Sequence, residues 1–190
     1  MNIVGLLLAA GSATRFGSDK LRHALPHGVA IAVQAARHLR GELPRVLVVV
    51  RSRDAMETFR AERCETALCE KAHEGMGASL ACAVRAAGKA DAYIVALADM
   101  PFVRPTTIAA VRAALEGGAA LAAPYFRARR GHPVGIAGRY YEELLALGGD
   151  EGARQLLSAN EAELVKIPVG DPGVVRDIDR PDDLAPPIRT

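Results

Sequence analysis

The sequence contains no tryptophan, and aromatic residues make up only 4% of its 190 residues. Such a composition suits tight packing of helices on a sheet better than an aromatic-rich binding surface. The net charge is only +2, and no long run of one charge occurs. We therefore expect neither a nucleic-acid groove nor a membrane-binding face.

Cysteine and long hydrophobic runs are also scarce. Cys64, Cys69 and Cys82 are odd in number and match no CxxC or Cys/His zinc spacing, so buried reduced thiols are expected. No apolar run approaches the ~18 residues that a membrane-spanning helix needs. The first apolar stretch lacks the positive charge of a secretory signal, because no Lys or Arg precedes Arg15. These absences favour a cytoplasmic protein.

What the sequence does contain is a series of short, continuous apolar segments. Three of them are typical of strands buried on both faces, namely Ile3–Ala9, Arg45–Val50 and Ala92–Ala98. Weaker strand candidates are Glu65–Cys69, Ala119–Ala123, Val134–Ala137 and Glu163–Pro168.

Helical stretches separate these segments. We predict helices at Val29–Leu39, Ser52–Arg63, Gly77–Ala87 and Thr106–Glu116, three of them ended by Gly41, Gly88 and Gly117. The alternation predicts one α/β domain with a three-layer α/β/α architecture, a mostly parallel mixed sheet and ligands at the carboxyl ends of the strands. Only YFRARRGHP, after Pro124, is expected to be irregular.

The loop that follows the first strand combines glycine with positive charge. Gly11 and Gly17 permit a ligand to approach the backbone closely, while Arg15 and Lys20 supply two cations. This combination favours binding of a polyphosphate. The loop fits neither the Walker A pattern GxxxxGK[ST] nor the dinucleotide pattern GxGxxG. An ordinary strand-to-helix loop with exposed cations is the alternative.

Six motifs in order carry a resemblance to a known family. LAAGSATRFGSDK, at residues 8–20, resembles the LAAGxSxRxGxxK signature of nucleotidyltransferases that activate sugar phosphates, terpenoid precursors and the molybdenum cofactor. The others are EGMGASL, LADMP, GHPVGI, GDEGAR and DIDRPDDL, which begin at residues 74, 97, 131, 149 and 177. GMGASL, GHP and GDEGAR together are similar to the molybdenum cofactor cytidylyltransferase group of the MobA-like NTP transferase family. The chain departs from the family pattern at Ala13, Met100 and Arg180.

The resemblance implies a Rossmann-like nucleotidyltransferase fold with Mg²⁺ held by Asp99 and Asp179. Asp99 directly follows the third strong strand, and Mg²⁺ prefers hard oxygen ligands of this kind. Asp177, two residues before Asp179, is the less favoured second ligand. Each main candidate has a structural alternative, because Asp99 could cap the helix near Pro105 and Asp179 the turn at Pro181.

The nucleotide is expected to lie against the first loop and the GMGASL segment. Arg15 and Lys20 would hold the β- and γ-phosphates, as catalytic residues together with Asp99. By resemblance, the backbone of Ala9, Ala10 and Gly11 also contacts the nucleotide. The resemblance further implies that Gly77 and Ser79 lie near the base, although Ser79 could instead simply cap its helix. Ala10, where guanylyl-transferring relatives more often have Gly, favours CTP.

The acceptor is expected to contact His132 and Arg154. Their structural alternatives are a turn residue beside Pro133 and a solvated side chain, on a helix that we expect Asp150 to cap. The implied reaction transfers CMP from CTP to the phosphate of a molybdopterin-type cofactor, with a molybdenum hydroxylase as a downstream partner. Another phosphorylated acceptor, GTP as donor, or a non-catalytic cofactor carrier are the alternatives.

Overall fold

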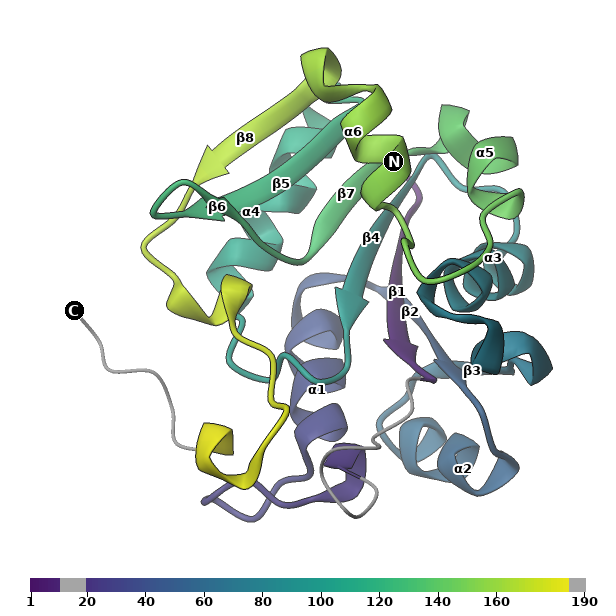
Figure 1. The fold of residues 1–190 in the computed structure, drawn as a ribbon, viewed down its shortest axis with the longest axis vertical. Helices are drawn as coiled ribbons and strands as arrows, with labels where there is room; N and C mark the ends of the chain where they lie inside the picture. Colours follow the sequence, from purple (N-terminus) through teal and green to yellow (C-terminus); the bar gives the residue numbers. More distant parts are fainter. Residues whose placement is uncertain (11–19, 185–190) are drawn as a thin grey trace.

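The structure is a computed structural model that describes residues 1–10 and 20–184. An eight-stranded mixed sheet in the order β3-β2-β1-β4-β7-β5-β6, with β8 paired to β5, forms its centre (Figure 1). The strands are β1 (Ile3–Ala9), β2 (Arg45–Val50), β3 (Glu65–Leu68), β4 (Ala92–Leu97), β5 (Leu121–Phe126), β6 (Arg129–Arg130), β7 (Val134–Ala137) and β8 (Leu164–Pro168). The α-helices are α1 (Ile31–Glu42), α2 (Arg53–Ala61), α3 (Met76–Ala87), α4 (Pro105–Glu116), α5 (Tyr141–Leu145) and α6 (Arg154–Ala159).

One half of the sheet is parallel and the other is mixed. β1 lies between β2 and β4 and is parallel to both, and β3 continues the parallel half beyond β2. β7 then runs antiparallel between β4 and β5, while β8 pairs with β5 in parallel. The carboxyl ends of β1 to β4 therefore meet at one edge of the sheet, where open α/β sheets bind their ligands.

Helices cover both faces of the sheet. Alternate residues of β1 enter two separate hydrophobic clusters, Ile3 and Leu7 in one and Leu6 and Leu8 in the other. The first cluster contains buried residues of α1, α2 and α4, and the second contains those of α3, α5 and α6. Because the strands are buried on both sides, they read as continuous apolar runs in the sequence. The predicted three-layer α/β/α architecture is confirmed.

Most of the predicted elements are found close to their expected bounds, but the predicted end of α1 was wrong. The helix continues through Gly41 to Glu42. Leu39 and Leu43 are both buried, and the Leu43 amide donates to the Leu39 carbonyl at 3.0 Å. Burial of these two side chains offsets the roughly 1 kcal/mol that an internal glycine costs a helix.

The segment after Pro124 is also more regular than predicted. β5 runs through Pro124 to Phe126 and forms a hairpin with β6. The turn is made by Arg127 and Ala128, whose φ angles are +48° and +64°. Non-glycine residues rarely adopt positive φ, so the sequence carries no ordinary turn signal here.

Within the part of the chain that the structure describes, no helix combines the length and the apolar character needed to cross a membrane.

Candidate functional site

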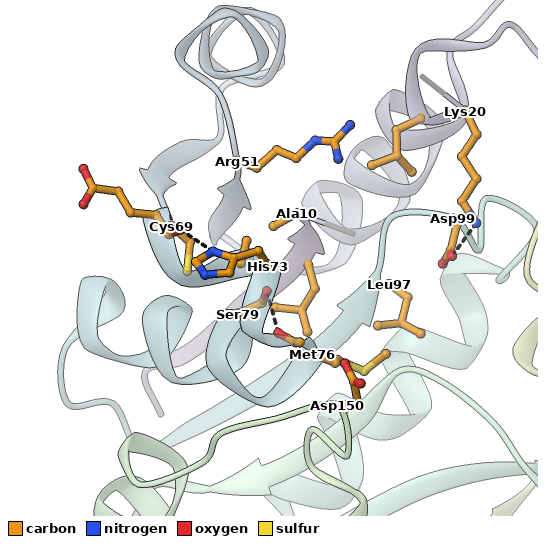
Figure 2. A pocket seen from close by; sticks show the side chains of 15 residues that line it. Ala10, Lys20, Arg51, Cys69, His73, Met76, Ser79, Leu97, Asp99 and Asp150 are labelled. Atoms are coloured by element: carbon orange, nitrogen blue, oxygen red, sulfur yellow. Dashed lines mark hydrogen bonds and ion pairs between the residues drawn. The ribbon is translucent and has the colours of Figure 1, made fainter. Parts of the chain in front are cut away.

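A cleft of about 580 Å³ opens where the parallel strands end (Figure 2). Leu8 lines it from β1, Arg51 directly follows β2, and Asp99 follows β4. In Figure 2, Lys20 and Asp99 lie on one side of the cleft, and Arg51, Cys69 and His73 lie on the opposite side. This is the edge of the sheet that the strand pattern predicts for a ligand.

An ion-paired cluster lies at the Asp99 side of the cleft. The Lys20 ammonium donates to Asp99 Oδ2 at 3.1 Å and to Asp179 Oδ1 at 2.8 Å. Burial alone would lower the pKa of Lys20, but the hydrogen bond to Asp179 and the charge of Asp99 outweigh it and raise the pKa above its usual value. Lys20 is therefore a charged ammonium held between two carboxylates.

Asp177 belongs to the same cluster. One carboxylate oxygen from each of Asp99, Asp177 and Asp179 lies within 4.8 Å of the others. Asp177 is exposed, but desolvation of its carboxyl group by the neighbouring chain, followed by the negative charge of Asp179 and Asp99, raises the pKa of Asp177. The structure thus brings together both predicted metal ligands and the less favoured alternative.

A backbone contact explains how these distant segments meet. The Ile178 amide donates to the Asp99 carbonyl at 2.9 Å, which fixes the later segment beside the end of β4. The Ile178 side chain is fully buried against Leu25 and Ile31. Because both the backbone and the side chain of Ile178 are fixed, the neighbouring residues Asp177 and Asp179 lie close to Asp99.

At both predicted capping positions, the described hydrogen bonds are accepted by other acids. At the start of α4, Asp171 accepts hydrogen bonds from the Arg104 amide at 2.8 Å and the Thr107 hydroxyl at 2.7 Å. At the later turn, Asp183 accepts from the backbone amides of Asp179 and Arg180. Because other acids satisfy these donors, the Asp99 and Asp179 side chains lie in the cluster instead.

The predicted phosphate-binding residues are only partly described. Arg15 and Gly11 lie outside the described residues. Lys20 lines the cleft, but its ammonium contacts the acidic side chains. Ala10 lines the cleft too, whereas Ala9 lines a neighbouring cavity of about 240 Å³ beside α1 and α2, which shares Leu21 and Arg51 with the cleft.

The start of α3 forms another part of the wall. Ser79 lines the cleft and is buried, but its hydroxyl donates to the Gly75 carbonyl at 3.1 Å, one turn earlier in the chain. The capping alternative for Ser79 was therefore wrong, since α3 already begins at Met76. The Gly77 amide donates to the Gly149 carbonyl at 2.7 Å, so Gly77 packs this turn against the GDEGAR loop.

The two predicted acceptor contacts are not among the described residues that line the cleft. The peptide bond between His132 and Pro133 is cis. His132 Nδ1 is buried and has no hydrogen-bond partner among the described residues. Burial lowers its pKa to about 4, so the ring is neutral at pH 7. Arg154 is exposed at the first residue of α6.

Asp150 was also placed wrongly as a helix cap. α6 begins after Ala153 without a side-chain capping bond, and Asp150 lines the cleft instead. Its position follows from close packing between the loop and the start of α3, where a Cβ added to Gly75 would lie 2.3 Å from Asp150 Oδ1.

No functional role was predicted for the other polar residues of the cleft. Arg51, Glu70 and His73 line the cleft, and His73 Nδ1 lies 3.0 Å from the Glu70 carbonyl. The sequence interpretation gave His73 no special role. Arg51 could have been found, because it directly follows β2 at the same sheet edge as Asp99.

The acidic cluster is suited to a hard divalent cation. All three candidate ligands are carboxylates, and oxygen donors of this kind are preferred by Mg²⁺ and Mn²⁺. The cluster borders a cleft, so a bound ion would also be within reach of substrate phosphates. The residues present therefore fit a divalent metal.

Most of the chain matches one known protein family. Residues 5–164 match the MobA-like NTP transferase domain. The chain belongs to this family. It is accordingly a nucleotidyltransferase, and the predicted family resemblance is confirmed.

Individual relatives are similar along almost the whole chain. Purine catabolism protein PucB of Bacillus subtilis is 28% identical over 193 residues, covering 95% of this chain and 93% of PucB. Rv0371c of Mycobacterium tuberculosis, solved in complex with manganese, has a TM-score of 0.77 at 21% identity and covers 96% of both chains. Molybdopterin-guanine dinucleotide biosynthesis protein A of Archaeoglobus fulgidus has a TM-score of 0.66 at 22% identity, covering 95% of this chain and 94% of that one. The two structural likenesses show a shared fold.

Proposed function

We propose that this nucleotidyltransferase is a Mg²⁺-dependent cytidylyltransferase, which transfers CMP from CTP to the phosphate of a molybdopterin-type cofactor and releases pyrophosphate. The observation that carries the proposal is the convergence of Asp99, Asp177 and Asp179 at one side of the cleft. A carrier that only held the cofactor would not require this concentration of negative charge, which opposes binding of a phosphate unless a metal ion neutralises it.

Asp99 and Asp179 are the ligands we assign to Mg²⁺, with Asp177 completing the acidic wall. A bound Mg²⁺ would supply positive charge to the α-phosphate and to the departing diphosphate. Arg15 and Lys20 are assigned to the β- and γ-phosphates. The Ala10 and Ser79 side of the cleft then remains for the base.

The reaction needs no strong general base. An oxygen of the acceptor phosphate, already anionic near neutral pH, attacks the α-phosphorus of CTP, and the bond to the bridging oxygen of the β-phosphate breaks. Pyrophosphate leaves with the electron pair of that bond. Catalysis by the chain then consists of aligning the two phosphates and neutralising their charge.

Two observations support the choice of substrates. Ala10, the residue that favours CTP by resemblance, is buried in the wall of the cleft, where its methyl group would narrow the space beneath a bound base. The acceptor is supported by the motif combination and by the structural likeness to a protein named for molybdopterin-guanine dinucleotide biosynthesis.

The test is pyrophosphate release by the purified protein with Mg²⁺ and either CTP or GTP, with and without molybdenum cofactor. We expect release with CTP that depends on the cofactor and exceeds release with GTP at least about tenfold, a discrimination worth roughly 1.4 kcal/mol. Preferential release with GTP would overturn the nucleotide assignment, and release with a sugar phosphate alone would overturn the acceptor. If no combination of donor and acceptor gives pyrophosphate, a non-catalytic carrier of the cofactor would be favoured.

A further inference from the structure

Lys20 lies at the point that a cation shared by Asp99 and Asp179 would take. Its ammonium contacts one oxygen of each, at 3.1 and 2.8 Å, and its side chain is only 12% exposed. The third acid, Asp177, lies within 4.8 Å of the same two carboxylates. Lys20 is thus held between two of the three acids of the cluster, Asp99 and Asp179, although the sequence analysis assigns it to the nucleotide phosphates.

Charge explains why an ammonium is stable there. Three neighbouring carboxylates repel one another, and a single ammonium between two of them reduces that repulsion. A divalent cation would do the same more strongly, but it carries charge of the same sign as Lys20. The ion and the ammonium therefore compete for the same oxygens.

We propose that Lys20 is a displaceable internal counter-ion of the metal site, which a divalent cation must expel before it binds Asp99 and Asp179. The inference rests on the proposed metal-dependent transfer function. Once expelled, the ammonium is free to bind the β- or γ-phosphate of the nucleotide, so one side chain performs both tasks in turn.

Coupling between metal and nucleotide follows from this exchange. A metal ion alone must displace Lys20 without providing it with a new anionic partner, so it binds weakly. A nucleotide that binds with the metal provides phosphate oxygens for the released ammonium. Each ligand then raises the affinity for the other by the same factor, as linkage requires.

The proposal is tested by equilibrium binding of Mn²⁺ without nucleotide at pH 7, measured from the electron paramagnetic resonance signal of free Mn²⁺. Lys20→Met keeps the length of the side chain but removes its charge. We expect this variant to bind Mn²⁺ about tenfold more tightly or better than wild type, because one neighbouring charge typically shifts an ionic equilibrium by one to three powers of ten. CTP should raise the Mn²⁺ affinity of Lys20→Met by a smaller factor than it raises that of wild type, because the variant has no ammonium for the phosphates to bind.

Lys89→Met is the matched control. Lys89 also pairs with an acid, Glu142, at 3.8 Å, but it is 79% exposed and lies just before β4, at the end of that strand opposite Asp99. Its removal should leave Mn²⁺ affinity within about twofold of wild type, because exposed charges are screened. Asp99→Asn in the Lys20→Met background should abolish the gain, which locates the ion at the acidic cluster.

The possible outcomes distinguish failure of the counter-ion proposal from failure of the proposed metal-dependent function. The counter-ion proposal is overturned if a folded Lys20→Met protein binds Mn²⁺ no more tightly than wild type without nucleotide, while both proteins bind Mn²⁺ in the presence of CTP. That result would leave the proposed metal-dependent function unaffected. Failure of both proteins to bind Mn²⁺ even with CTP overturns the two together. Lys20→Gln serves if Lys20→Met does not fold. In wild type, Mg²⁺ and CTP should shift the ¹⁵Nζ resonance of Lys20, and an unchanged resonance at saturation overturns the exchange.

Discussion

At the scale of single residues, the cluster depends on where two chain segments touch. Asp99 could be predicted from sequence, because an acid at the carboxyl end of a buried parallel strand lies at the ligand-binding edge of the sheet. Asp179 could be suggested only by family resemblance, since its position depends on the Ile178 amide reaching the Asp99 carbonyl. The pairing of Lys20 with both acids was not predicted, because tertiary side-chain contacts of this kind leave no local pattern.

Replacing Asp99 by Asn should remove transfer activity without unfolding the protein. Loss of outer-shell partners of metal ligands typically costs 10–100-fold in metal affinity or activity, so we expect loss of a direct ligand to cost at least about a hundredfold in turnover. The measurement is pyrophosphate release with saturating Mg²⁺ and CTP, together with circular dichroism.

Asp91→Asn is the control for this prediction. Asp91 precedes the same strand at its opposite end, where its carboxylate accepts a hydrogen bond from the Asn2 amide at 2.6 Å. Turnover should stay within about twofold of wild type, as expected for an exposed site away from the chemistry. Comparable losses in both variants would show that Asp99 acts through stability rather than through the metal.

His132 should make the folded protein sensitive to mild acid. Its pKa is lowered to about 4 by burial, compared with an ordinary value of 6.5. Between these values the unfolded chain binds a proton that the folded chain does not, so stability falls as pH falls through this window, by at most about 1.4 kcal/mol per pH unit. The measurement is the free energy of unfolding in urea between pH 4.5 and 7.

His132→Gln should have a shallower dependence over that range. His38, whose pKa is also lowered by burial, is unchanged in the variant and contributes equally to both proteins. The difference between the two slopes therefore isolates His132. Parallel slopes would mean that the His132 ring takes up a proton as readily in the folded chain as in the unfolded one.

At the scale of elements, the start of α3 is held by close contact with the GDEGAR loop rather than by a capping side chain. A Cβ added at Gly77 would lie 2.3 Å from the Gly148 carbonyl oxygen, and Gly75 has a φ of +122°. Side-chain caps are the usual sequence signal of a helix start, and the capping alternative for Ser79 followed from that signal, but α3 has no side-chain cap. The motif glycines could be read from sequence, but their packing partner could not.

Gly77→Ala should destabilise the protein by about 1–3 kcal/mol, the usual range for overpacking, and should also weaken nucleotide binding. The second effect is expected because Met76 and Ser79, on the same helical turn, line the cleft. Urea denaturation and titration with CTP and Mg²⁺ are the two measurements.

Gly41→Ala provides the opposite expectation within the same chain. Gly41 lies inside α1, and a Cβ added there meets no atom within 4 Å. We expect a gain of about 0.4–1 kcal/mol in stability, with nucleotide binding unchanged. Stabilisation by both substitutions would contradict the packing described for Gly77.

At the scale of the whole molecule, hydrophobic pattern sets the layers but not the order of every strand. The predicted runs Ile3–Ala9 and Arg45–Val50 coincide with β1 and β2, and the predicted run Ala92–Ala98 exceeds β4 by one residue. The antiparallel insertion of β7 between β4 and β5 could not be read from its four residues, because pairing depends on partners far along the chain. The β5–β6 turn was not predicted for a different reason. Its residues Arg127 and Ala128 have positive φ angles, which the sequence usually signals by glycine.

The position of the site followed from this parallel half. Four carboxyl ends meet at one edge, and the cleft opens there, so even an incomplete topology located the ligand edge. The positions of His132 and Arg154 could not be predicted from the sheet topology. They were assigned from motifs alone, and their side chains lie outside the described wall of the cleft.

The proposed transfer reaction requires one divalent cation that binds between Asp99 and Asp179 and contacts the nucleotide. The most direct measurement is a crystal structure with Mn²⁺ and a non-hydrolysable CTP analogue, in which anomalous scattering locates the ion. We predict one peak at about 2.0–2.2 Å from a carboxylate oxygen of each residue and from an α-phosphate oxygen, with Lys20 moved onto the phosphates. A fully bound analogue with the ion elsewhere, or with Lys20 still between the two carboxylates, would contradict the account.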